Sequence, residues 1–436
     1  MSITRELIDY ISSKPFSQRD LDATALLALD AVATAYAGSA TPTGKILLDW
    51  ARSCEGDLGR CVLLMGALTH ITETDDLHRA SVTHPGCVVI PTALALGEQV
   101  GASAEKILVS IIHGFEAMCR VGAAVGPMHY KVWHNTATCG PFGSAMAAAT
   151  LLDLDAEQTM HALGNAGTQS SGFWEFMATG AMSKHLHAGR AGESGLLAAQ
   201  LAAHGFTGSP EILEGEKGMF AGMCPDPNPD AVMAKPEDDW QVHATSIKPW
   251  PSCRHTHPGI DCALELHRQI NGAEIKSVEL DVYQAALDVC NRPQPESEYA
   301  AKFSLYHTAA IALLDGVVGL GSFDQNAREK TCELRGRVQV NVVDPYAGNY
   351  PESWGTGVRV STSNGQEFSA SRKDCLGDPE LALNDSQMRT KAEGLLDFAG
   401  LKDNTRSTIC DSILGMAKHK VRPANIYSSF ISHLSL

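Results

Sequence analysis

The sequence predicts a mainly α protein, in which a large all-helical domain is built from both chain ends and a smaller α+β domain is inserted between them. Three observations support this prediction. Apolar residues recur at helical spacing through roughly the first 235 residues, period-two patterns typical of strands first appear after Cys224, and helical patterns return after Pro379. We therefore expect the helical domain over residues 1–240 and 385–436, and the α+β domain over residues 241–384.

The helices of the first domain are expected where apolar spacing meets a cap or a helix breaker. Leu21–Ala37 is apolar at helical spacing and should stop at Gly38, and a further helix should begin at Pro91 and end before Gly101. Other helices are expected over residues 61–70, 103–121, 145–152, 156–165 and 188–204. Alanine and glycine are dense in these segments, and small residues let helices approach closely, so this domain should be tightly packed.

The inserted domain is expected to hold strands over Ser277–Tyr283 and Arg337–Val343 and a hairpin of Gly357–Thr362 with Glu367–Ser371. The hairpin should turn at Asn364-Gly365, because this dipeptide readily adopts the positive φ that tight hairpin turns need. A helix is expected between the strands, over residues 303–318, and two more follow the domain, over residues 386–398 and 405–419.

The composition is that of a globular protein with an acidic surface. Of 436 residues, 44% are hydrophobic and 19% charged, and 34 basic against 50 acidic residues give a formal net charge of −16. This charge disfavours nucleic acid and anionic membrane surfaces as partners. It also disfavours small anions, but charges interact weakly beyond roughly 8–10 Å in physiological salt. A locally basic pocket could therefore still bind a polycarboxylate.

Targeting and cysteine patterns favour a cytoplasmic protein. The first residues are charged and polar, unlike those of a secretory signal peptide, and we find no run of about 18 apolar residues that would suggest a membrane span. The 12 cysteines are scattered and form no CxxC pair, so we expect free thiols in a reducing compartment.

Common catalytic motifs are absent from the sequence. It contains no GxxxxGK(S/T) phosphate loop, no GxSxG nucleophile elbow and no HExxH zinc motif. His185-x-His187 and His255-x-His257 could each hold a metal ion if they lay on strands, but neither has a carboxylate ligand nearby in the sequence. We therefore expect no metal ion at these pairs.

Five polar segments are candidates for a functional cleft, because Lys, His or Tyr recurs in them at element boundaries. They are residues 73–86, 133–140, 182–192, 246–258 and 302–307. Each segment alone is also compatible with helix capping or with a hydrogen-bonded core residue, and their joint recurrence favours convergence on one site. The aromatic segment Phe173–Phe176 is expected to be core packing rather than a lid.

In this order and spacing, the segments resemble the MmgE/PrpD family, which includes 2-methylcitrate dehydratases, cis-aconitate decarboxylases and iminodisuccinate epimerases. The resemblance covers nearly the whole chain, from Asp30-Ala-Val-Ala-Thr-Ala-Tyr-Ala-Gly to the Leu313-Leu-Asp-Gly that follows Lys302-Phe-Ser-Leu-Tyr. It implies a helical domain from both chain ends, a smaller α+β lid domain, an active site between the two, and a homodimer. It also implies catalysis without a metal ion, an iron–sulfur cluster or a nucleotide.

The resemblance implies the site residues as well. Carried over motif by motif, the catalytic positions fall on His84, His134, Lys184, Lys248 and Tyr306. The acidic position falls on Asp75 or on its neighbours Glu73 and Asp76. The choice stays open because the interval between Asp75-Asp76 and Thr83-His84-Pro85 is longer here than in the decarboxylase branch.

One further position departs from the decarboxylase branch, which carries a histidine where this chain has Cys253. The adjacent Arg254 and His255 could supply the missing contact, since a guanidinium can grip a carboxylate with two parallel hydrogen bonds. We therefore expect Glu73, Cys253, Arg254 and His255 to bind the substrate.

The expected function is a cofactor-independent lyase that dehydrates or decarboxylates a small di- or tricarboxylate by moving a proton next to a carboxylate. Lys184 and Lys248 would hold the carboxylates, His84 or His134 would transfer the proton, and Tyr306 would donate to a leaving oxygen or to the carbanion. Two alternatives stay open: an epimerase of an iminodisuccinate-like dicarboxylate, and a non-catalytic polycarboxylate-binding protein.

Overall fold

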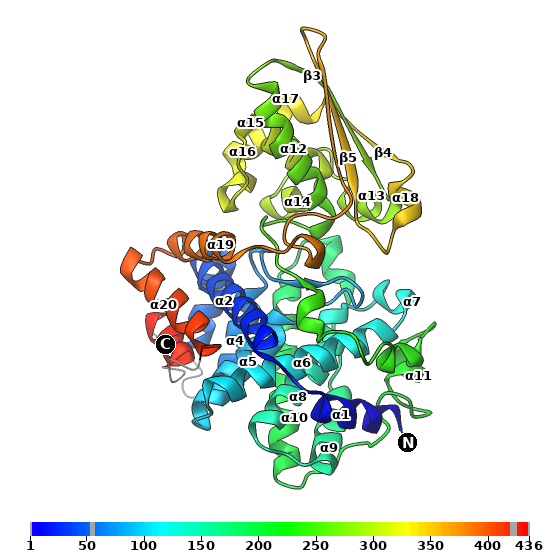
Figure 1. Cartoon of the computed structure of the whole chain (residues 1–436), viewed down its shortest axis with the longest axis vertical. Coiled ribbons are helices and arrows are strands. Elements are labelled where there is room, and N and C mark those ends of the chain that lie inside the picture. The colour runs from blue at the N-terminus through cyan, green and yellow to red at the C-terminus, as the bar shows by residue number, and fades with distance from the viewer. Residues whose placement is uncertain (1, 53–56, 419–424, 435–436) are drawn as a thin grey trace. The chain divides into compact units, whose positions relative to one another are not determined.

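A computed structural model describes residues 2–52, 57–418 and 425–434, and the chain divides into two compact units (Figure 1). The helical unit takes in Met1–Ile71, Asp75–Ile247 and Asn384–Leu436, and the α+β unit takes in Thr72–Thr74 and Lys248–Leu383. A mainly helical unit from both chain ends with an inserted α+β unit confirms the predicted fold class.

The helical unit consists almost entirely of α-helices. Its N-terminal elements are α1 (Ile3–Ser13), α2 (Gln18–Ala40), α3 (Pro42–Ala51), α4 (Leu58–Thr69), α5 (Gly86–Gln99), α6 (Ala104–Ala124), α7 (Pro127–Tyr130), α8 (Asn135–Leu151), α9 (Ala156–Gly167), η1 (Trp174–Ala178), α10 (Ser183–Ala203), α11 (Met219–Met223), η2 (Pro229–Met233) and η3 (Gln241–Ala244). The C-terminal helices are α19 (Asp385–Phe398), α20 (Asp403–Met416) and α21 (Ile426–His433), and β1 (Leu77–His78) pairs with β2 (Thr245–Ser246). Residue 419, where the last predicted helix ends, lies outside the described residues.

Helix α2 runs past the glycine that was expected to end it. A side chain on Gly38 would place its Cβ only 2.0 Å from the carbonyl oxygen of Leu68 in α4. Gly38 is therefore explained by the close approach of the two helices and does not terminate α2, which continues to Ala40.

Two buried helices contain an internal proline, and both begin earlier than predicted. α5 begins at Gly86 and carries Pro91, and α8 begins at Asn135 and carries Pro141. A proline inside a helix frees the carbonyl four residues before it, here that of Cys87 in α5. A Cβ on Gly66 would lie 2.6 Å from this Cys87 oxygen, so the neighbouring helix packs directly against it. Burial thus overrides the local signal for a helix start at Pro91.

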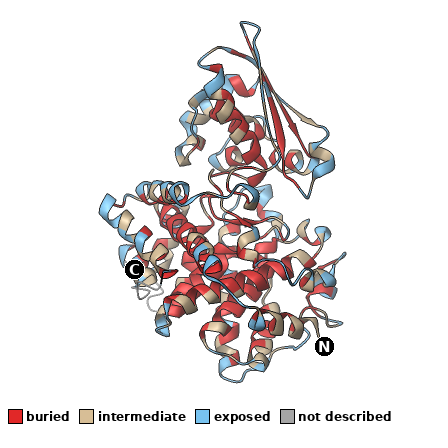
Figure 2. Cartoon of the chain, viewed as in Figure 1, coloured by how far each residue is buried: buried red, intermediate tan, exposed pale blue. Residues whose placement is uncertain are grey.

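The core of this unit depends on backbone-to-backbone packing around α10. Figure 2 shows the buried residues gathered in the middle of the unit. A Cβ on Gly189 would lie 2.2 Å from the carbonyl oxygen of Leu63 in α4, and a Cβ on Gly195 would lie 2.5 Å from that of Pro141 in α8. The tight helical packing expected from the Ala and Gly content is therefore present.

Gly189→Ala should lower the free energy of unfolding by about 1–3 kcal/mol, because the new methyl group overlaps backbone atoms that cannot rotate away. Urea unfolding of the intact protein measures this change. Gly394→Ala in α19 is the matched control, because no atom lies within 4 Å of the added Cβ, and it should be neutral or stabilising. Equal stability of the two variants would mean that the α4–α10 contact is looser than described.

The two chain ends meet inside the helical unit. α19 packs on α2, and Lys391 of α19 forms an ion pair with Asp30 of α2. Asp30 is 1% exposed and the Lys391 side chain 8% exposed, so the pair is buried.

Two helices of the unit depart from the expectation that no stretch is apolar enough to cross a membrane. By length and composition alone, α2 and α6 meet that criterion. In each, 83% of the most apolar 18-residue window is buried inside the structure, as in the core helices of many folded domains.

The α+β unit surrounds a four-stranded sheet. Its elements are η4 (Arg254–Thr256), α12 (His257–Ile270), β3 (Ile275–Val282), α13 (Gln284–Cys290), α14 (Glu298–Lys302), α15 (Leu305–Asp315), η5 (Leu320–Phe323), α16 (Gln325–Lys330), α17 (Cys332–Arg335), β4 (Val338–Val342), α18 (Tyr346–Asn349), β5 (Thr356–Thr362), β6 (Glu367–Arg372) and η6 (Pro379–Leu381). The strand order is β4-β3-β5-β6, with β4 parallel to β3 and the other pairs antiparallel. The predicted strands and the Asn364-Gly365 hairpin are confirmed, with Gly365 at φ 84°.

The alternation of apolar and polar side chains along the strands sets the register of the sheet. Leu280 pairs with Val358, and both are buried, with Gly259 of α12 facing Leu280. On the other face, Arg359 pairs with Glu279, and their side chains form an ion pair at 2.6 Å. The sheet therefore buries one face under α12 and presents charged residues on the other.

The helix predicted over residues 303–318 is α15, which is shorter than expected at both ends, and a separate helix, α14, precedes it. α14 ends at Lys302, and α15 begins at Leu305 because the Ser304 hydroxyl accepts a hydrogen bond from the main-chain N–H of His307. α15 ends at Gly316, which adopts the left-handed conformation (φ 65°) that favours glycine at a helix end.

Candidate functional site

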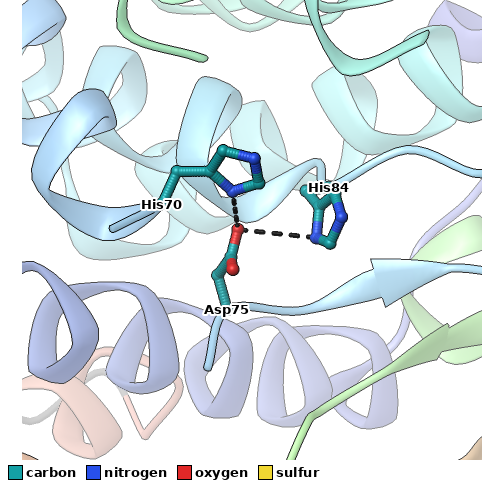
Figure 3. Close-up of side chains that lie close together, drawn as sticks. All are labelled: His70, Asp75 and His84. Carbon is teal, nitrogen blue, oxygen red and sulfur yellow. Dashed lines mark hydrogen bonds and ion pairs between the residues drawn. The ribbon is translucent and has the colours of Figure 1, made fainter. Parts of the chain in front are cut away.

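His70 and Asp75 form a buried pair in the helical unit (Figure 3). His70 follows α4 directly, and its Nδ1 lies 2.6 Å from Oδ2 of Asp75, with both side chains at most 1% exposed. An ionised carboxylate only accepts hydrogen bonds, so Nδ1 of His70 carries a proton. Nε2 of His70 is also buried and has no hydrogen-bond partner among the residues that the structure describes. The pair therefore presents an oriented imidazole nitrogen inside the helical unit.

His84 approaches the same carboxylate from the loop before α5. Its Nδ1 lies 3.5 Å from Asp75 Oδ2 and 2.5 Å from the main-chain oxygen of Asp76, and its ring meets that of His70 edge-on at 4.8 Å. The Asp76 carboxylate accepts hydrogen bonds from the main-chain N–H of Gly86, at 3.0 Å to each oxygen. Asp75 is thus the acid that contacts the two histidines, while Asp76 supports the start of α5.

A metal ion is one ligand that this group could hold. One ligating atom from each of His70, Asp75 and His84 lies within 4.8 Å of the others. Both histidines, however, use Nδ1 as a hydrogen-bond donor, one to Asp75 and the other to the main-chain oxygen of Asp76. A metal ion bound through these nitrogens would displace both protons. A metal ion bound through Nδ1 would therefore break both hydrogen bonds, and with these bonds kept the two rings are oriented for acid–base chemistry.

His134 stacks on His70 at the entrance to α8. The two ring centroids lie 5.7 Å apart with the planes at 19°, and Trp174 packs on His134 at 4.6 Å. The main-chain N–H of His134 donates to the oxygen of Gly172 at 3.0 Å. Burial lowers the pKa of His134 well below its usual value, and the nearby His70 and Lys184 lower it further. His134 is therefore neutral at physiological pH.

The first turns of α10 add Lys184 and His187 to this group. Lys184 is 4% exposed and lies close enough to lower the pKa of His134. His187 Nδ1 lies 3.4 Å from His134 Nδ1, and burial, followed by His70 and Lys184, lowers the pKa of His187 to about 4. We call His70, Asp75, His84, His134, Lys184 and His187 the histidine cluster.

A hollow of about 540 Å³ lies beside the histidine cluster and is lined in part by His187. Phe173 and Phe176 also line it, with Phe173 56% exposed and Phe176 buried. The expectation that this aromatic segment is core packing therefore holds for Phe176 and is wrong for Phe173.

Lys248 and Glu73 form a second buried group, which belongs to the α+β unit. Lys248 Nζ lies 3.6 Å from Glu73 Oε2 and 3.3 Å from the main-chain oxygen of Glu73, and both residues are 2% exposed. Glu73 adopts φ 60°, a conformation that costs about 1–3 kcal/mol for a residue other than glycine. This conformation lets both its carbonyl and its carboxylate face the ammonium group.

Cys253 lies close to this pair. A hydrogen bond from the Cys290 thiol is the main reason that the pKa of Cys253 is lowered, and Lys248 contributes in the same direction. The Cys253 main-chain N–H donates to the oxygen of Lys302 at 2.9 Å. Cys253 thus lies beside Lys248 and Glu73, which were also predicted to be site residues.

Arg254 and His255 each bond to partners within the α+β unit, although Nη1 of Arg254 is buried with no hydrogen-bond partner among the described residues. Arg254 donates to both carboxylate oxygens of Asp378, with Nε 3.1 Å from Oδ1. His255 Nδ1 lies 2.6 Å from the hydroxyl of Tyr283, and its ring stacks on Trp354 at 4.5 Å. Burial and the charge of Arg254 lower the pKa of His255 to about 3. In this structure, both residues hold the α+β unit together.

Tyr306 hydrogen-bonds at the surface of the α+β unit. Its hydroxyl donates to Asn291 Oδ1 at 3.0 Å in an exposed setting, and burial raises its pKa. The proposed donor role of Tyr306 therefore has no support from these contacts.

Two members of the histidine cluster were not among the predicted site residues. His70 closes an apolar helix three residues before the polar segment 73–86, and His187 was considered only as half of a metal-binding HxH pair. Both HxH pairs lie on helical segments instead of strands. The sequence offered one signal for His70, its spacing of five residues from Asp75. This spacing indicates a contact only if the turn between the two residues is known.

The protein belongs to the MmgE/PrpD family. Residues 5–231 match the model of the MmgE/PrpD N-terminal domain, and residues 250–414 match that of the C-terminal domain.

Similar curated proteins are named cis-aconitate decarboxylase. The one from Aspergillus terreus is 24% identical over 91% of this chain and 89% of its own length. The Mus musculus protein is 26% identical over 79% of this chain and 73% of its own, and the Homo sapiens protein is 26% identical over 63% and 60%.

Proposed function

We propose that the protein is a lyase that decarboxylates a small unsaturated tricarboxylate of the cis-aconitate type. The observation that carries this proposal is the histidine cluster, in which an Asp75-oriented imidazole, a neutral imidazole and a lysine share one buried site. The names of the relatives support the same reaction class.

Decarboxylation requires a cation and a proton donor in the active site. When a carboxylate leaves as carbon dioxide, the electrons of the broken C–C bond stay on carbon and spread over the adjacent double bond and carboxylate. A fixed cation is needed to stabilise this negative charge, and a proton donor is needed to protonate the carbanion. Lys184 supplies the cation and His134 the proton, because His134 is neutral and keeps an N–H to donate.

The Asp75–His70 pair has a binding role in this scheme. A carboxylate held next to the unpartnered Nε2 of His70 can receive a hydrogen bond from the imidazolium form, whose other N–H is held by Asp75. His84, bonded to the same segment, would support the position of Asp75. Assembly as a homodimer and a cytoplasmic location stay predictions from the sequence.

The reaction is tested by incubating the protein in D₂O with cis-aconitate, citrate, 2-methylcitrate and iminodisuccinate while NMR follows the products. We expect carbon dioxide release from cis-aconitate or a close analogue, with one deuterium incorporated in the product. Water release from citrate or 2-methylcitrate would favour a dehydratase. Exchange of a C–H signal without a new product would favour an epimerase, and binding without any change would favour a non-catalytic protein.

His134→Ala and Lys184→Ala should each lower kcat on the accepted substrate by about 10²-fold or more, since one loses the proton donor and the other the stabilising cation. Steady-state rates and circular dichroism are measured together, so that loss of fold is recognised. Lys106→Ala, which removes a lysine paired with the exposed Asp153, is the control and should keep full activity. Near-normal turnover by both site variants would refute this site.

A further inference from the structure

The proposed decarboxylation consumes one proton from water in every turnover, because carbon dioxide leaves with no proton and the product carbon gains one. His134 is 1% exposed and packs against His70 and Trp174. It therefore cannot collect this proton from bulk water directly, and another titratable group has to connect it to solvent.

His187 is placed to make this connection. Its Nδ1 lies 3.4 Å from Nδ1 of His134, whereas its ring also lines the 540 Å³ hollow. Gly172 lies against both residues, because its oxygen accepts the main-chain N–H of His134 and a Cβ on it would lie 3.2 Å from Nδ1 of His187. Phe176 packs edge-on against the His187 ring at 5.6 Å.

The hollow can bring water to His187. Its rim includes the exposed side chains of Phe173 and Leu186, so it reaches the surface of the helical unit. Polar side chains that can bind water also line it, namely Gln169, Ser183 and Ser194. His187 therefore has a buried imidazole on one side and a space accessible to water on the other.

We propose that His187 relays protons from water in this hollow to His134, in service of the proposed decarboxylation. The carbanion takes the proton on Nε2 of His134, Nδ1 of His134 takes the proton on Nδ1 of His187, and Nε2 of His187 takes a proton from water. One proton enters and one C–H bond forms. Each ring is left in its other tautomer, and a ring flip restores it before the next turnover.

The test uses His187→Ala, which removes the relay and enlarges the hollow. We expect kcat with the accepted substrate to fall about ten-fold or more while KM changes little, because the relay supplies a proton and does not hold the substrate. Added imidazole should occupy the hollow and restore kcat in a saturable manner, and imidazoles of different pKa should rescue to different extents. His187→Gln keeps the side-chain size without a titratable group, and it should be slow even when fully folded.

Arg190→Gln is the matched control, because Arg190 lines the same hollow one turn further along α10. It should keep the wild-type kcat and should not respond to imidazole. Full activity of His187→Gln, or a slow His187→Ala that imidazole does not rescue, would overturn the relay while the lyase function stands. Absence of carbon dioxide release from the wild-type protein would overturn the proposed function, and the relay with it.

Discussion

Asp75→Asn should lower kcat by about 10³-fold or more and leave the fold intact. Asp75 is the only hydrogen-bond partner recorded for Nδ1 of His70 among the described residues, at 2.6 Å. An asparagine amide can turn its NH₂ toward this nitrogen, which moves the ring proton to Nε2 and removes the charge that stabilises an imidazolium. Loss of both the tautomer and the charge removes the hydrogen bond from His70 to the substrate carboxylate, which must be stabilised as charge develops in the transition state.

A second buried aspartate of the helical unit provides the control for this substitution. Asp20 Oδ1 lies 2.6 Å from Nε2 of His243, a distance equal to that between Asp75 and His70, but outside the histidine cluster. Asp20→Asn should change stability without changing kcat. Steady-state kinetics and thermal unfolding of both variants separate the two effects. Equal losses of kcat would indicate that buried His–Asp pairs support the fold generally and that Asp75 has no special role.

Lys391→Met should lower the free energy of unfolding by about 3–5 kcal/mol, because it leaves the carboxylate of Asp30 buried without its lysine. Denaturant unfolding measures the loss. The double variant Asp30→Leu with Lys391→Met removes both charges and should recover most of the stability. Lys106→Met breaks an ion pair with the exposed Asp153 and should cost less than about 1 kcal/mol. A loss of that small size for Lys391→Met would mean that the chain ends are joined mainly by apolar contacts.

The fold could be predicted because the spacing of apolar residues changes along the chain from helical to strand-like and back. The hairpin turning at Asn364-Gly365 and the strand at Ser277–Tyr283 were recognisable from alternation and turn chemistry. Helix starts were less predictable. Gly38 and Pro91 were interpreted as local boundary signals, yet both lie inside helices whose burial outweighs local propensity.

The site could be predicted only in part, for a different physical reason. Asp75, His84, His134 and Lys184 stand in polar segments, and the structure places all four in the histidine cluster. Arg254 was expected to bind the substrate, and nothing in its local sequence indicates that it also bonds to Asp378, which lies 124 residues later. Contacts over such separations depend on the completed fold and leave no short-range pattern.

The bond between Arg254 and Asp378 also bears on how this chain could have diversified. The two residues stand near the points where the main segment of the α+β unit, Lys248–Leu383, begins and ends. Because they are bonded, the entering and leaving segments of that unit run close together. A domain whose ends meet can be exchanged for another without stretching its host. The segment Lys248–Leu383 should therefore tolerate exchange as a whole, provided that its ion pair with Glu73 is kept.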